Sequence, residues 1–301
     1  IVASENNTTV TITPSNNIVG HVANIPFNII LNKGQTYAAI ASSVFANVHL
    51  DGSKVSSDKP IAITVSDDLL YGAVYGGCAD LAGDQIIPIN QIGSEYIAVR
   101  GGLNAPYDQL FVTATQNGTS INQDGVFLTT INAGQTYQTA LVNNNTYITT
   151  SNPAYLYQLS GLGCEVGAAI LPQITCTGSS EIQFQRTTTD NLFITLLVKS
   201  SGINNFLVNG VSGVISGASF IPVPGTSSQW YTSKVLLPLA SYPVNSIVNI
   251  SNSSSLFHLG VLQGDNTGGT SFGYFSDFNT ITANASSNTV CYGDTLKLFS
   301  N

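Results

Sequence analysis

The sequence predicts an all-β protein in which about three repeated β-sandwich-like units pack into one elongated or compact array. Along the 301 residues, short segments of β-branched residues alternate in polarity with period two, which is typical of strands buried on one face. Asp-Gly and Asn-Gly pairs separate these segments and tolerate the positive φ of tight turns. No segment keeps apolar residues at the i, i+3, i+4, i+7 spacing for three turns, so any helix should be a short connector.

The individual strands are predicted from local patterns. Residues 8–13 read Thr-Thr-Val-Thr-Ile-Thr, and this alternation predicts a half-buried strand. The same reasoning predicts strands at 27–31, 61–65, 96–99, 110–114, 192–198 and 247–250. The predicted turns are Asp51-Gly52, Asn117-Gly118, Asp124-Gly125 and Asn209-Gly210.

A recurring order of motifs indicates that one supersecondary plan is used more than once. The segment 31–37, Leu-Asn-Lys-Gly-Gln-Thr-Tyr, returns at 131–137 as Ile-Asn-Ala-Gly-Gln-Thr-Tyr, and Phe193 begins a looser third copy. Because Tyr37 and Tyr137 recur with the motif, we expect both to pack at a shared structural corner. The predicted copies span about 1–110, 111–190 and 191–280.

The C-terminal residues have a different pattern. Residues 281–288 form a predicted polar linker, and residues 289–301 restart the strand alternation. We interpret 289–301 as the first strand of a truncated immunoglobulin-like domain, in which Cys291 takes the place of an inter-sheet cysteine. Because the sequence contains no methionine, we expect the chain to be a processed or excised piece of a longer product.

Charge and composition exclude several classes of partner. Eight Lys+Arg against sixteen Asp+Glu give a net charge of -8, so no basic stripe is available for nucleic acid or for an anionic membrane surface. No apolar run approaches the roughly 20 residues of a membrane helix, so no direct membrane insertion is expected. A polar, Lys-poor composition is common in exported surface proteins and predicts an extracellular, cell-surface location.

Several motifs occur in an order that matches a known family. They are Glu5–Ile12, 31–37, Ser57–Ala62, Asp80–Pro88, Gly163–Glu165, Leu171-Pro172, Cys176–Ser179 and Phe272–Phe278. Over about residues 1–278 the chain resembles the bacterial branch of the IgGFc-binding-protein N-terminal-like domain family. The resemblance implies a surface protein of the kind found in gliding Bacteroidota, with downstream immunoglobulin-like repeats and a type IX secretion signal. Antibody binding, which gave the family its name in animals, is not carried over.

Four cysteines are too few for a disulfide scaffold, and no Cys-x-x-Cys or Cys/His spacing suggests zinc. Cys164 and Cys176 share one Gly- and Pro-containing segment, and an exported protein favours oxidation. We therefore predict a Cys164–Cys176 disulfide. The alternative pairs Cys78 with Cys164.

Five carboxylates, Asp67, Asp68, Asp80, Asp84 and Glu95, lie close together in the sequence. Calcium is the one cofactor they suggest, with Asp67, Asp68, Asp80 and Asp84 as ligands, because hard oxygen ligands gather only there. The alternative is that these groups are solvated or bind neighbouring backbone. Asp67 and Asp68 are adjacent and would point to opposite faces of a strand, which makes them a poor pair for glycoside hydrolysis.

Nothing in the sequence matches a catalytic motif. The histidines, His21, His49 and His258, are far apart, and nucleophile-elbow, zinc-protease and phosphate-loop patterns are absent. His258 lies between Phe257 and Leu259 and is interpreted as a structural histidine. The protein is therefore predicted not to be an enzyme.

Aromatic side chains on loops are the predicted contacts with a ligand, because a ring can stack on the apolar face of a sugar. They are Tyr71, Tyr75, Tyr107, Trp230 and Tyr231; core packing is the alternative for each. The predicted function is that of a non-catalytic cell-surface adhesin that binds extracellular glycan or a surface protein. A structural spacer in a surface fibre and a polysaccharide-active enzyme are the alternatives.

Overall fold

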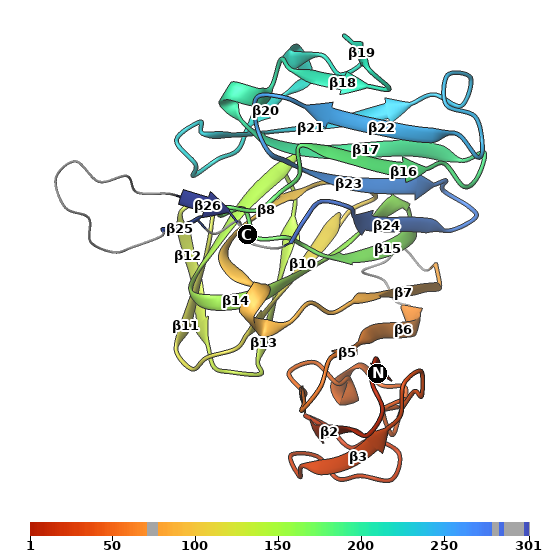
Figure 1. The fold of residues 1–301 in the computed structure, drawn as a ribbon, viewed down its shortest axis with the longest axis vertical. Coiled ribbons are helices and arrows are strands. Elements are labelled where there is room, and N and C mark those ends of the chain that lie inside the picture. The colour runs from red at the N-terminus through yellow and green to blue at the C-terminus, as the bar shows by residue number, and fades with distance from the viewer. Residues whose placement is uncertain (71–77, 279–282, 286–297, 301) are drawn as a thin grey trace, which may run out of the picture.

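The computed structural model describes residues 1–70, 78–278, 283–285 and 298–300, apart from the side chains of Asp68, 283–285 and 298–300. In these residues the chain is all-β, as predicted, and its helical residues form short 3-10 turns such as η1 (Ala46–Val48), η3 (Ile89–Gln91) and η4 (Ser200–Gly202). No helix among them is long and apolar enough to cross a membrane. Figure 1 shows the strands arranged from the N-terminal sheets at one end to the third group of sheets at the other.

The N-terminal part is small. A three-stranded antiparallel sheet has the order β3 (Phe27–Leu31), β2 (Thr8–Thr13), β4 (Lys54–Ser57), and β1 (Val2–Ala3) pairs with β5 (Ile61–Ala62). The alternation predicted at 8–13 is observed, because β2 buries every second side chain. Its core is formed by Ala3, Val10, Ile12 and Leu31, and Tyr37 packs against it.

A hairpin of β6 (Thr64–Leu70) and β7 (Asp80–Gln85) leads into the central sheet. That sheet contains β8 (Gly93–Val99), β9 (Gly102–Leu103), β10 (Asp108–Ala114), β11 (Thr119–Gln123), β12 (Val126–Ile131), β13 (Thr136–Leu141), β14 (Asn145–Gly163) and β15 (Glu165–Ile170). The 19-residue strand β14 pairs with β8, β9, β10, β11 and β15. It is therefore the strand that joins this part of the protein into one sheet.

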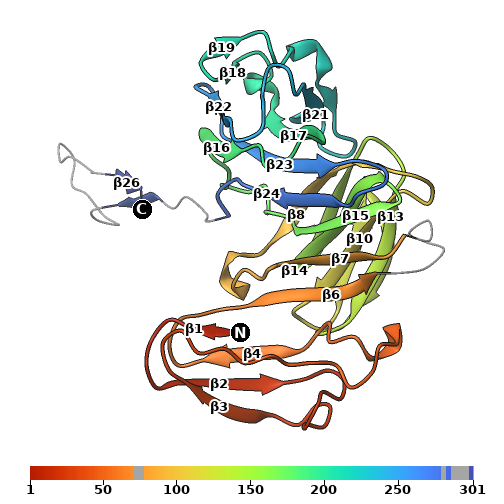
Figure 2. The ribbon, with the colours of Figure 1, turned by 90° about the vertical axis from the view of Figure 1, so that its right-hand side faces the viewer.

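The third part is built from two sheets. One has the order β16 (Glu181–Gln185), β22 (Ile247–Asn252), β18 (Phe206–Val208), β19 (Val211–Ser212). The other has the order β20 (Ile221–Pro222), β21 (Trp230–Leu237), β17 (Asn191–Lys199), β23 (Phe257–Gly264), β24 (Thr270–Tyr274). Apolar side chains from both sheets form one core, the arrangement of a β-sandwich. Figure 2 shows these sheets stacked beyond the central sheet.

The three parts have similar strand pairings. In the central part β10 pairs with β14, and β11 pairs with β12 and β14. In the N-terminal part β1 pairs with β5, and β2 pairs with β3 and β4. In the third part β17 pairs with β23, and β18 pairs with β19 and β22. The boundaries at 110 and 190, and the number of separate sandwiches, stay predictions.

The Gly-Gln-Thr-Tyr motif closes the same loop in two of these parts. The backbone N–H of Asn32 donates to Gln35 Oε1 at 2.7 Å, and that of Asn132 donates to Gln135 Oε1 at 2.7 Å. Gly34 and Gly134 adopt φ of +79° and +81°, a conformation that glycine adopts without steric cost. Tyr137 packs against the central core, so the predicted structural corner is confirmed for both tyrosines.

The loop at Gly134 also contacts the N-terminal part, at the Asp51-Gly52 turn. A Cβ added to Gly52 would lie 2.0 Å from the carbonyl oxygen of Gly134. Gly52 has a φ of +78°. A side chain at Gly52 would therefore push the N-terminal part away from the central part.

The C-terminal residues differ in part from the prediction. Residues Ala283–Ala285 form β25, which pairs antiparallel with β26 (Leu298–Ser300). Part of the predicted linker at 281–288 is therefore a strand, because it finds a partner within the segment predicted to start the next domain. Cys291 lies outside the described residues.

Candidate functional site

The predicted Cys164–Cys176 disulfide is wrong. Cys78 and Cys164 form the disulfide, with their Cα atoms 5.6 Å apart, and Cys176 is free and exposed. The bonded pair is 86 residues apart in sequence. Cys78 precedes β7 and Cys164 connects β14 to β15, so the pairing follows from strands that meet only in the fold. This was the alternative left open by the sequence.

The aspartates proposed as calcium ligands have separate partners. Asp80 Oδ2 accepts a hydrogen bond from Val166 N–H at 2.9 Å, and Asp84 Oδ2 accepts one from Ile170 N–H at 2.7 Å. Asp67 instead lies 3.3 Å from His49 Nε2. Asp80 and Asp84 are four residues apart on β7, as Val166 and Ile170 are on β15, so both carboxylates match the spacing of backbone donors along β15.

Among the described side chains, the group that brings metal-ligating atoms within 4.8 Å of one another is Cys78, Cys164 and Glu165, not the predicted aspartates. The predicted calcium set is therefore not assembled by Asp67, Asp80 and Asp84; the side chain of Asp68 is outside the description. Carboxylates that bind neighbouring backbone were the alternative, and Asp80 and Asp84 do so.

The predicted aromatic contacts differ in how far they are exposed. Tyr71 and Tyr75 lie outside the described residues. Trp230 is 9% exposed and packs with Ile97, Ile174, Leu197 and Val223, so it is a core residue and not a free contact. Tyr231 is half-buried against the core of the third part. Tyr107 is half-buried on a loop and has a φ of +74°, so it retains the exposure that a contact needs.

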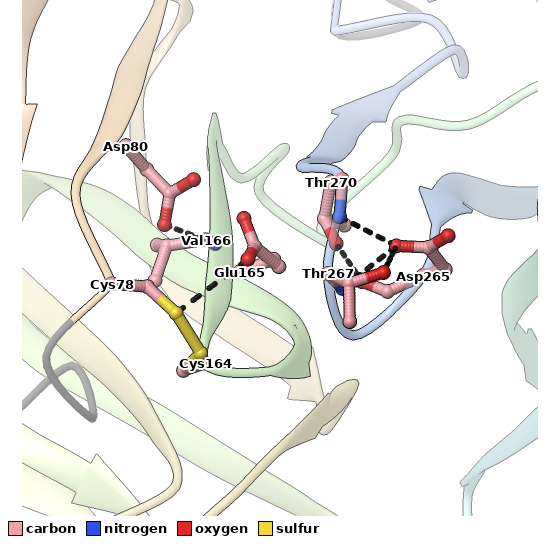
Figure 3. Close-up of a disulfide and its surroundings, with 9 residues drawn as sticks. Cys78, Asp80, Cys164, Glu165, Val166, Asp265, Thr267 and Thr270 are labelled. Carbon is pink, nitrogen blue, oxygen red and sulfur yellow. Dashed lines mark hydrogen bonds between the residues drawn. A yellow bond between two sulfur atoms is a disulfide. The ribbon is translucent and has the colours of Figure 1, made fainter.

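A polar pocket of about 320 Å³ lies beside the disulfide, between β7, the loop before β17 and the β23–β24 hairpin. It is lined by Asp80, Leu81, Thr187, Thr188, Asp190, Gln263, Gly268, Gly269, Thr270 and Ser271. Figure 3 shows the disulfide and Asp80 on one side and the hairpin loop from Asp265 to Thr270 facing them. Carboxylate, amide and hydroxyl groups therefore meet in one open pocket.

The hairpin loop of the pocket is held by Asp265. Its Oδ1 accepts hydrogen bonds from Thr267 N–H at 2.8 Å and Gly268 N–H at 2.6 Å. These backbone donors lower the pKa of Asp265, because they favour the ionised carboxylate. Figure 3 shows this carboxylate turned onto its own loop, so it shapes the pocket.

The opposite loop is held by a buried arginine. Arg186 is 1% exposed and donates to backbone carbonyls only: Thr188 at 3.0 Å, Leu237 at 3.0 Å, Tyr242 at 3.2 Å, Thr189 at 3.4 Å, and Asp190. Three of these acceptors belong to residues 188–190. A planar guanidinium with five donors suits such a set of carbonyls. Arg186 therefore positions Thr188 and Asp190, which line the pocket.

Gln263 joins β23 to the loop before β17. Its Nε2 donates to Thr188 Oγ1 at 3.0 Å, and its Oε1 accepts from Thr187 Oγ1 at 3.1 Å. Thr188 Oγ1 in turn donates to Asp190 Oδ2 at 2.6 Å. The lining side chains are thus oriented in one network before any ligand arrives.

Glu165 lies at the edge of this pocket, next to the disulfide. Desolvation raises the pKa of Glu165, and the Asp80 carboxyl, within hydrogen-bonding reach, raises it further, whereas the Gly269 N–H lowers it. Two carboxyl groups in such direct contact leave no room for the sugar that separates the pair in a glycosidase, about 5 Å or more apart. The Glu165–Asp80 pair therefore does not have the spacing of the carboxyl pair of a glycosidase.

The family model described as IgGFc binding protein matches residues 1–262. The chain belongs to this family. The match confirms the family to which the motifs point. It includes Asp80, Leu81, Thr187, Thr188 and Asp190 of the pocket and ends before Gln263. No curated protein matches the chain.

One solved structure, titled "anti-sigma factor domain-containing protein", is 12% identical and covers 58% of this chain and 80% of its own. Its TM-score is 0.17, too low to carry an argument about the fold or function of this IgGFc binding protein family member.

Sequence reasoning missed most of the pocket. Asp190, Gln263 and the threonines at 187–188 come from segments that no motif joined, and their proximity depends on the pairing of β17 with β23. The sequence did carry one signal, since Asp265-x-Thr-Gly-Gly is a loop in which an aspartate binds the following backbone amides.

Proposed function

We propose that this protein is a non-catalytic binding module of an extracellular, cell-surface protein, and that it recognises a glycan or a surface protein through loops. Membership of the IgGFc binding protein family supports a binding role. The observation that carries the proposal is the pre-oriented pocket lined by Asp80, Asp190, Gln263 and threonine hydroxyls. Such groups donate and accept hydrogen bonds as sugar hydroxyls do.

Export is part of the same proposal. The Cys78–Cys164 disulfide fits an oxidising environment, where such bonds persist. The low number of basic residues fits a surface exposed to other cells and polymers. A bacterial source, type IX secretion and a gliding-associated role follow the resemblance of the motifs, and belong to the proposal in the same way.

A binding assay tests the pocket. The wild-type chain and the Asp190→Asn variant are applied to a glycan array and to immobilised extracellular proteins, with Asp51→Asn as the control. Asp51 is exposed and lies in the N-terminal part, so its change removes the same charge away from the pocket. We expect Asp190→Asn to lose binding at least tenfold and Asp51→Asn to keep it.

Three results would reject the proposal. Equal binding by wild type and Asp190→Asn would reject this pocket as the site. Whole-cell adhesion that survives deletion of residues 1–278 would favour the structural spacer. Release of shorter sugars from a polysaccharide on incubation with the wild-type chain would favour an enzyme.

A further inference from the structure

A second pocket, of about 200 Å³, lies where the central and third parts meet. It is lined by Val99, Arg100, Asn144, Ser219, Ile221, Thr232, Ser233 and Lys234. Two of the chain's eight basic residues are in this one set, and the set contains no carboxylate. This charge is opposite to that of the pocket beside the disulfide.

Both cations keep hydrogen-bond donors for a ligand. Lys234 Nζ donates to the carbonyl of Gly101 at 2.5 Å, and the Arg100 guanidinium donates to the carbonyl of Val142. In the described part of the chain, His49–Asp67 is the ion pair found within 4.0 Å, so neither cation has a carboxylate at that distance. An ammonium has three donors and a guanidinium has five. Each group uses one donor in its bond to the backbone carbonyl.

The position of Lys234 is set by a buried carboxylate behind the pocket. Asp108 is fully buried, and its Oδ2 accepts hydrogen bonds from Gly101 N–H at 2.9 Å and Gln158 Nε2 at 2.8 Å. The Gly101 residue therefore binds Asp108 through its N–H and Lys234 through its carbonyl. Asp108 is the acidic group whose charge acts on Lys234 from behind the pocket.

The two cations are near enough to repel each other. Desolvation lowers the pKa of Lys234, Asp108 raises it, and the charge of Arg100 lowers it. An anion bound in the pocket would relieve the repulsion between Lys234 and Arg100.

Neutral groups complete the lining. Ser219 Oγ and Ser233 Oγ are 2.7 Å apart, and either can be the donor. The Asn144 side chain is on an exposed residue. The Tyr107 ring, 4.9 Å from the Arg100 guanidinium, lies next to the pocket through that contact. Hydroxyls that both donate and accept, together with an aromatic ring, suit sugar hydroxyls and a sugar face.

We propose that this pocket binds the carboxylate or sulfate group of an acidic saccharide. Its volume fits one charged group, with the rest of the saccharide extending over Asn144 and Tyr107. An acidic peptide such as hexaglutamate would use the two cations, but it has no sugar ring whose apolar face could lie on Tyr107. The site is separate from the pocket beside the disulfide, so the inference goes beyond the proposed function and stands without it.

Calorimetric titration of the whole chain tests this. The probes are a hyaluronan hexasaccharide, which carries carboxylates, a dextran sulfate oligosaccharide, which carries sulfates, neutral dextran, and hexaglutamate. We expect one or both acidic saccharides to bind, with dextran and hexaglutamate at least tenfold weaker. Arg100→Gln and Lys234→Gln should each weaken binding at least tenfold, whereas Lys33→Gln, an exposed residue of the N-terminal part, should leave it within twofold.

A further variant keeps the test valid if Lys234→Gln does not fold. Ser219 is exposed, so Ser219→Asp should keep the wild-type melting temperature while its negative charge abolishes binding. The proposal is overturned if neither acidic saccharide binds, if dextran or hexaglutamate binds as tightly, or if Lys33→Gln loses as much as the pocket variants. Asp190→Asn should leave this binding unchanged, which separates it from the proposed function.

Discussion

His258 should make the protein lose stability in mild acid. The side chain is fully buried in β23, with Nδ1 2.9 Å from Ser276 Oγ and Nε2 3.2 Å from Thr177 Oγ1. Desolvation lowers the pKa of His258 from 6.5 to about 4, against an opposing effect of Asp277. The sequence-based interpretation of a structural histidine is confirmed by this burial.

The size of the effect follows from linkage. Because the folded-state pKa is below the unfolded value, the stabilisation is fully present above pH 6.5 and is lost as the pH falls through about 4. The difference between the two pKa values corresponds to about 3 kcal/mol, of which about 2 kcal/mol is lost by pH 5. The free energy lost on protonation of His258 is then a considerable fraction of the free energy of unfolding of an ordinary domain.

Urea denaturation at pH 7, 6, 5 and 4 measures this. The free energy of unfolding of the wild type should fall more steeply with decreasing pH than that of His258→Gln, because the variant lacks the titrating ring and shares all carboxylates with the wild type. The His21→Gln control keeps His258 and should keep the steep component. A wild-type minus His258→Gln difference that is the same at every pH would refute the reasoning.

Three further predictions concern stability. Replacing Cys78 and Cys164 together by alanine should cost about 4–5 kcal/mol in the chain-entropy model, because the bond closes a loop with a sequence separation of 86; urea denaturation measures it, and Cys176→Ala, which alters the free exposed cysteine, should change little. Arg186→Lys should cost at least about 2 kcal/mol, because three ammonium donors cannot serve five carbonyls; an unchanged melting temperature would contradict this. Trp230→Ala should cost about 3–5 kcal/mol as a core truncation, and a folded variant of wild-type stability that has lost only ligand binding would contradict it.

The strands were predictable because their signal is local. Alternation at residues 8–13 and 27–31 matches β2 and β3 residue for residue. The Gly-Gln-Thr-Tyr motif was predictable for the same reason, since the glutamine binds a backbone amide three residues earlier in each copy. Short-range hydrogen bonds and side-chain alternation both depend on residues that are close together in the sequence.

The candidate sites were not predictable because they depend on long-range contacts. Lys234 binds the carbonyl of Gly101, 133 residues away, and Gln263 binds Thr188 across 75 residues. Asp80 and Asp84 looked like metal ligands because the sequence cannot show that β15 lies beside them and donates two backbone N–H groups to them. Trp230 looked like a loop contact because the apolar partners that bury it come from four separate segments.

The cysteine bond described above also determines how the protein would respond to mechanical tension. A pull applied at the two ends of the chain would pass from Cys78 to Cys164 through the sulfur atoms, and would bypass the residues between them. Those residues, including all of β14, would be withheld from extension. At about 3.5 Å per extended residue, about 300 Å of chain length would stay hidden until the bond was reduced, so the central sheet would stay shielded from load while its neighbours stretched.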